Sequence, residues 1–145
     1  MNETRHIPVL LEEAVAGMAV RAGDTVVDAT FGGGSHAQRL LQQVGPSGRV
    51  IAFDRDASAF ARFKEHASVP ENLVLVHANY SELEESLSTL GVTEVDAVLA
   101  DLGFSSDQIE TPERGLSFLE DGPLDMRLNQ DDAVTAQDVV MTKSE

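Results

Sequence analysis

The stretch from Asp28 to Ala37, which reads Asp-Ala-Thr-Phe-Gly-Gly-Gly-Ser-His-Ala, constrains the fold of this chain more than any other feature. The apolar segment before it, residues 25–27, has the composition of a buried strand. After it, Leu40 and Val44 follow Ala37 at the spacing of one helix face. A strand, a glycine turn and a helix in this order are typical of an α/β fold, in which the turn and the first helix amides lie against a ligand.

Three further apolar segments predict strands, and a polar residue follows each of them. Residues 49–53 lead to Asp54, residues 73–77 are followed by Tyr80, and residues 95–100 end at Asp101. Helical patterns connect these segments at residues 57–67 and at residues 81–90, where residues 81–84 form a predicted capping box. Alternating strands and helices predict a parallel sheet, which binds ligands at the carboxyl ends of its strands. We therefore expect the glycine turn and these three polar residues to share one edge.

The glycine turn also fits the dinucleotide fingerprint. Gly32, Gly34 and Ala37 have its spacing, and Asp54 follows about twenty residues later, where an acidic residue binds ribose hydroxyls. Asp54 could instead cap a helix or lie in a solvated loop. Tyr80 could lay its ring beside a planar base, or it could be an interfacial ring with a hydrated hydroxyl. An NAD-dependent oxidoreductase is therefore one function that these residues allow.

Composition excludes several other classes. The 145 residues include no cysteine and only four scattered histidines, so the sequence predicts no disulfide framework and no metal site. The chain has no apolar run of the roughly 18 residues that a membrane span needs, and residues 1–7 lack the apolar core of a signal peptide. These observations predict a cytoplasmic protein with one domain. The net charge of −15 provides no basic footprint for nucleic acid.

Residues 103–128 have no sustained apolar period and are rich in Gly, Pro, Ser and charged side chains, which predicts a long functional loop. Eight carboxylates and two arginines lie between residues 107 and 132. Five apolar residues are expected to anchor this loop, namely Phe104, Phe118, Leu119, Leu124 and Met126. Thr135 is a predicted N-cap for a helix that begins at residue 136.

Several of these runs resemble the amino-terminal part of one family, the MraW (RsmH) methyltransferases, which modify the N4 amine of a cytosine in 16S ribosomal RNA. The most specific run is Asp101-Leu-Gly-Phe-Ser-Ser-Asp-Gln, and it continues through residues 113–118 and 121–127. The glycine turn at residues 28–36 and the run Asp54-Arg-Asp agree as well. The resemblance covers essentially the whole chain.

The resemblance implies a Rossmann-like class I fold whose parallel sheet has the strand order 3-2-1-4, with the later strands missing from this chain. It implies S-adenosylmethionine as the cofactor and small-subunit ribosomal RNA or the 30S subunit as the substrate, and it leaves a homodimer open. Asp101 becomes the candidate catalytic residue, with Asp125 as the second choice. The positions that match cofactor-binding residues are Gly34, Ser35, His36, Asp54, Tyr80, Asp101 and Gln108.

The same resemblance predicts how the chain is organised. Residues 1–145 are expected to be a single, partial methyltransferase domain, with a substrate or cofactor loop at 103–128 and the start of a helical insertion at 135–145. Family chains are considerably longer, so we expect a fragment or a truncated product. An inactive cofactor-binding fragment or regulatory module is therefore the second hypothesis for function.

The chain departs from the family pattern at two places. Residues 32–36 read Gly-Gly-Gly-Ser-His where the family has Gly-Arg-Gly-Gly-His, and Asp107 stands where the family has proline. Ser35 still offers its backbone N–H, so we expect cofactor binding to be weakened rather than lost.

Overall fold

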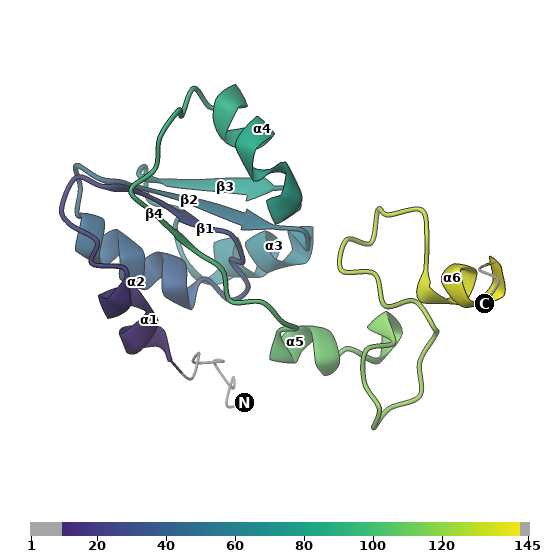
Figure 1. Cartoon of the computed structure of the whole chain (residues 1–145). Coiled ribbons are helices and arrows are strands. Elements are labelled where there is room, and N and C mark those ends of the chain that lie inside the picture. The colour runs from purple at the N-terminus through teal and green to yellow at the C-terminus, as the bar shows by residue number, and fades with distance from the viewer. Residues whose placement is uncertain (1–9, 143–145) are drawn as a thin grey trace. The chain divides into compact units, whose positions relative to one another are not determined.

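The computed structural model describes residues 10–142, which divide into two compact units that meet between residues 102 and 103. The first unit contains a four-stranded parallel sheet with the order β3-β2-β1-β4 (Figure 1). Its strands are β1 (Thr25–Asp28), β2 (Arg49–Asp54), β3 (Leu73–His77) and β4 (Ala97–Leu99). This order confirms the expected Rossmann-like topology, in which the first strand lies inside the sheet and the chain crosses over between neighbours.

Helices cover both faces of this sheet (Figure 1). They are α1 (Leu11–Gly17), α2 (Ser35–Val44), α3 (Ala57–His66) and α4 (Leu83–Thr89). On one face Val26 and Val50 pack with Leu40 and Phe63 of the helices α2 and α3. On the other face Val27, Ile51 and Phe53 pack with Leu87 of α4. Because both faces are covered, β1 and β2 read as continuous apolar runs rather than as alternating ones.

The predicted capping box at residues 81–84 does not cap α4. Asn79 caps the 3₁₀ turn that precedes α4, because its side-chain oxygen accepts a hydrogen bond from the Ser81 N–H at 3.1 Å, and no described side chain caps α4 itself. This 3₁₀ turn spans Tyr80–Glu82, and α4 begins only at Leu83. An asparagine directly after a strand can accept from the backbone two residues on, and it therefore starts the turn earlier than the predicted capping box would.

The strand β4 is shorter than predicted, with residues 97–99 in place of 95–100. The reason lies at Asp96, whose carboxylate accepts the Thr25 N–H at 2.8 Å while its own N–H donates to the Thr25 carbonyl at 2.8 Å. A side chain therefore satisfies the backbone donor of β1 that a longer β4 would have bound, so the regular ladder begins at Ala97, two residues later than predicted.

The second unit contains α5 (Ser106–Ile109), a 3₁₀ turn at Pro112–Arg114 and α6 (Ala136–Thr142). Thr135 caps α6 as predicted, since its hydroxyl accepts the Asp138 N–H at 3.2 Å. The prediction that five apolar residues anchor this loop is wrong. Phe118 and Leu119 are almost fully exposed, and Phe104, Leu124 and Met126 are about half exposed. Close backbone contacts order this segment instead, because Gly115 lies against Pro123 and Gly122 lies against Pro112.

Two further findings concern residues 10–142 alone. Their helices are too short or too polar for any of them to cross a membrane. They contain no group of three or more histidine, aspartate and glutamate side chains placed to hold a metal ion.

Candidate cofactor-binding site

Backbone hydrogen bonds fasten the glycine turn to the strands on both of its sides. The Ala29 N–H donates to the Leu99 carbonyl of β4 at 2.8 Å. Two residues later the Phe31 N–H donates to the Phe53 carbonyl of β2, also at 2.8 Å. The start of the turn therefore bridges the carboxyl ends of three parallel strands, which all meet at one edge of the sheet.

Gly34 sets the shape of the turn immediately before α2. Its φ of +79° lies in the left-handed region, where a side chain is strained. A Cβ at this position would come within 2.8 Å of Phe31 Cζ and 3.0 Å of Phe63 Cδ2. The rings of Phe31 and Phe63 pack edge to face, with centroids 5.2 Å apart, so Phe63 belongs to the core. Because residue 34 is a glycine, no side chain covers the backbone immediately before Ser35 and His36, the first residues of α2.

Asp54 holds the glycine turn from the end of β2. One carboxylate oxygen accepts the Gly32 N–H at 2.8 Å, and the other accepts the Asp56 N–H at 2.8 Å. Burial raises the pKa of Asp54, and these two hydrogen bonds oppose the rise. The helix cap that was an alternative role for Asp54 belongs to Asp56, whose carboxylate accepts the Ser58 N–H at 3.0 Å. The predicted binding of a cofactor by Asp54 stays a prediction.

Asp28 is the site residue that the sequence reasoning missed. It is completely buried, with one carboxylate oxygen accepting the Thr30 N–H at 3.1 Å and the other without a partner in the described part of the chain. Burial raises the pKa of Asp28 to about 7, the charges of Asp54 and Asp101 add to the rise, and the N–H groups of Thr30 and Ala37 oppose it. The sequence does contain a signal for a role of Asp28, because this carboxylate ends an apolar segment four residues before the first glycine of the turn.

Asp101 and His36 approach the same edge from β4 and α2. The Asp101 N–H donates to the Thr30 hydroxyl oxygen at 2.7 Å, and the Asp101 side chain is exposed. His36 is buried, which lowers the pKa of its imidazole, while the nearby charge of Asp101 works in the opposite direction. This electrostatic coupling shows that the two predicted cofactor residues are neighbours.

Tyr80 follows β3 at the same edge and is about half exposed. The Ala78 N–H, two residues before it, donates to the Asp54 carbonyl at 3.1 Å and ties this segment to β2. Six of the seven predicted cofactor residues therefore belong to the first unit. Each lies at the carboxyl end of a strand or in the segment that follows it. They are Gly34, Ser35, His36, Asp54, Tyr80 and Asp101.

The seventh residue, Gln108, belongs to the second unit, where it completes a capping box. Its side-chain oxygen accepts the Ser105 N–H at 3.0 Å, and its own N–H donates to the Ser105 hydroxyl at 3.2 Å. Gln108 is buried. Its side chain therefore stabilises the start of α5, and its contact with a cofactor stays a prediction.

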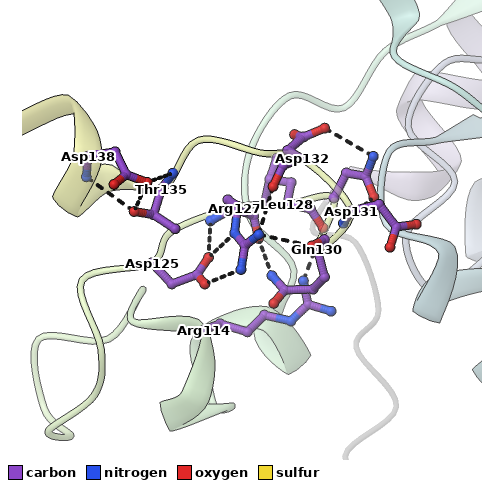
Figure 2. Close-up of polar contacts among 10 residues, drawn as sticks. Arg114, Asp125, Arg127, Leu128, Gln130, Asp131, Asp132, Thr135 and Asp138 are labelled. Carbon is purple, nitrogen blue, oxygen red and sulfur yellow. Dashed lines mark hydrogen bonds and ion pairs between the residues drawn. The ribbon is translucent and has the colours of Figure 1, made fainter.

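A polar network around Arg127 organises the loop before α6 (Figure 2). Asp125 accepts from Arg127 Nε at 2.9 Å and from Nη2 at 2.6 Å, while Nη1 donates to the carbonyls of Gln130 and Asp132. The hydrogen bonds from Arg127 lower the pKa of Asp125 to about 2. A carboxylate held in this way is a poor proton acceptor, so the geometry favours a structural role for Asp125 over the catalytic one considered from the sequence.

A parallel sheet of this order, with a glycine turn after its first strand and carboxylates at the ends of the neighbouring strands, defines a Rossmann-like cofactor-binding protein. Comparison with known families agrees with this class. Residues 3–145 match the model of the MraW methylase family. The chain belongs to this family.

Similar solved structures come from three bacteria. A candidate rRNA-methylase from Clostridium thermocellum is 28% identical, with a TM-score of 0.48 over 55% of this chain and 48% of its own. A cyclopropane synthase from Mycobacterium tuberculosis is 14% identical, with a TM-score of 0.48 over 72% of this chain and 33% of its own. A SAM-dependent O-methyltransferase from Thermotoga maritima is 20% identical, with a TM-score of 0.37 over 78% of this chain and 35% of its own. The chain thus spans about half or less of each.

The family implies S-adenosylmethionine as the cofactor, and the carboxyl edge of the sheet fits this molecule. S-adenosylmethionine carries a sulfonium and an ammonium group, whereas a dinucleotide carries a pyrophosphate. Asp54 and Asp101 place negative charge near the turn, and one buried oxygen of Asp28 lacks a partner among the described residues. The site therefore suits a cation better than a pyrophosphate.

Proposed function

We propose that this chain forms the cofactor-binding part of an S-adenosylmethionine-dependent methyltransferase that acts on the N4 amine of a cytosine in small-subunit ribosomal RNA. Membership of the MraW methylase family over residues 3–145 supports the reaction class. The observation that carries the proposal is the convergence of three carboxylates, those of Asp28, Asp54 and Asp101, on the glycine turn.

Bound S-adenosylmethionine supplies a methyl carbon made electrophilic by the adjacent sulfonium. The substrate amine would receive this methyl group and lose one proton, and S-adenosylhomocysteine would leave. The residues that would hold the cofactor are those around Gly34 together with Asp54. In this proposal the exposed carboxylate of Asp101 accepts a hydrogen bond from the cytosine amine and orients its lone pair. The cytosine has to leave its stack to reach this carboxylate.

Calorimetric titration of the chain with S-adenosylmethionine and with NAD tests the cofactor. We expect binding of S-adenosylmethionine and none of NAD, because the carboxylates around Gly34 repel a pyrophosphate. A preference for NAD would contradict the proposal and favour the oxidoreductase hypothesis.

A methylation assay on small-subunit RNA tests the activity, with Asp101→Asn as the variant. We expect methyl transfer to fall about tenfold or more, because a neutral amide accepts a hydrogen bond from the amine less strongly than a carboxylate does. Asp96→Asn removes a carboxylate from the opposite end of β4 and should leave the rate unchanged. Cofactor binding without any turnover by the unaltered chain would favour the inactive binding module.

A further inference from the structure

Thr30 links the carboxyl ends of β1 and β4 through two hydrogen bonds. Its backbone N–H donates to Asp28 at 3.1 Å, and its hydroxyl oxygen accepts the Asp101 N–H at 2.7 Å. Asp28 is completely buried and belongs to the sheet, whereas Asp101 is exposed and lies beyond the last residue of β4. Thr30 therefore connects a fixed point of the core to the candidate catalytic residue.

The position of this link explains why a side chain is needed. The backbone ladder between the two strands ends where the Ala29 N–H meets the Leu99 carbonyl at 2.8 Å. Beyond this point the chain turns toward β2, because the Phe31 N–H donates to the Phe53 carbonyl. A hydroxyl on residue 30 reaches back across the gap and binds the backbone of Asp101. Any residue except proline would supply the N–H for Asp28, but an apolar side chain would not supply this acceptor.

We propose that Thr30 is a positioning residue, whose hydroxyl fixes the backbone at Asp101 and so holds the Asp101 carboxylate beside the glycine turn. The inference rests on the proposed function, in which Asp101 orients the substrate amine, and on the match of Asp101 to a cofactor-binding position of the family. The electrostatic interaction between His36 and Asp101 indicates that the Asp101 carboxylate lies near the start of α2. Thr30 acts through Asp101 rather than through a contact of its own.

Two variants of Thr30 separate the hydroxyl from the shape of the side chain. Thr30→Val keeps the branched shape and removes the acceptor, and Thr30→Ser keeps the acceptor. Calorimetry should show S-adenosylmethionine binding roughly threefold to tenfold weaker in Thr30→Val and within about twofold of the unaltered chain in Thr30→Ser. Hydrogen exchange should be about tenfold faster at the Asp101 amide in Thr30→Val alone. Thr25→Val removes a hydroxyl from the opposite end of β1 and is the matched control.

Repeating Thr30→Val in an Asp101→Ala background shows whether Thr30 acts through the carboxylate. We expect the substitution to change binding by less than about twofold there, because the positioned group is gone. The full loss of affinity in this background, or unchanged affinity in the single variant, would overturn the inference while leaving the proposed function intact. An unaltered chain that does not bind S-adenosylmethionine would overturn the proposed function itself, and the inference with it.

Discussion

Asp28, the last residue of β1, destabilises the native state through its burial. Its carboxylate is completely buried, and one of its oxygens has no hydrogen-bond partner among the described residues. A buried acceptor of this kind destabilises the native state unless a ligand satisfies it. We expect a cation bound at the adjacent glycine turn to offset part of this cost.

The stability of the chain should therefore depend on pH through Asp28. Its pKa is about 7 in the native state, against an ordinary value of 3.8. Between these values the unfolded chain has lost the proton while the native state keeps it, so the free energy of unfolding falls as the pH rises. Below pH 4 the penalty is absent, and above pH 7 it is complete, on the order of 4 kcal/mol. Urea denaturation between pH 4 and pH 8 measures this dependence.

Asp28→Asn removes the charge while keeping the shape, so this variant should lose less stability than the unaltered chain over the same pH range. Asp24→Asn is the matched control, because Asp24 precedes the amino end of β1 and its carboxylate accepts the Arg21 N–H at the surface. Parallel pH profiles for the unaltered chain and Asp28→Asn would show that burial of this carboxylate does not control stability.

Among the elements, the loop before α6 shows how polar contacts can replace an apolar core. Arg127 binds both oxygens of Asp125 and two backbone carbonyls, so it closes the loop on itself (Figure 2). Between these two residues Met126 has a φ of +59°, a strained value for a side chain of its size. The ion pair that flanks Met126, together with its N–H bond to the Arg114 carbonyl at 2.9 Å, holds this conformation in place.

Arg127→Lys should loosen this loop. Lysine keeps the positive charge but cannot bind the two oxygens of Asp125 and two carbonyls at once, because it lacks the planar fork of arginine. We expect faster hydrogen exchange at residues 124–138 and an unchanged rate in the strands of the first unit, measured by mass spectrometry. Arg39→Lys is the control, since Arg39 pairs with Glu12 between α2 and α1. Exchange at residues 124–138 that stays at its original rate would show that the network does not order the loop.

At the scale of the whole molecule, a net charge of −15 conflicts with an RNA substrate. Binding to RNA depends largely on cations that neutralise phosphates. The arginines of the second unit are used internally, since Arg127 pairs with Asp125 and Arg114 donates to the Leu128 carbonyl. We therefore expect the arginines of the second unit to contribute little to phosphate binding.

This charge predicts weak binding of RNA by the chain alone. In fluorescence anisotropy at physiological salt, we expect a Kd for small-subunit RNA no tighter than about 10⁻⁴ M, the weak end of non-specific binding. Addition of S-adenosylmethionine should change this value little, because one bound cation hardly offsets the net charge. Micromolar binding that weakens steeply with salt would contradict the expectation and would indicate a basic surface formed by the fold.

Local patterns in the sequence were sufficient to predict the four strands, the connecting helices and the polar residues at the strand ends. Apolar runs bounded by glycine, proline and charged residues encode these elements directly, and parallel connections bring their carboxyl ends to one edge. The strand order and the family followed from the resemblance of residues 101–127 and of the glycine turn. None of these inferences required a contact between distant residues.

Only the tertiary structure decided how the site is held together. The contact of Thr30 with Asp101 joins residues 71 positions apart, and that of Gly32 with Asp54 joins residues 22 apart. The missing partner of Asp28 and the exposure of Phe118 depend equally on what packs around them. Sequence periodicity reports the conformation of neighbouring residues, whereas these contacts depend on strand order, register and burial, which the chain acquires only when it folds.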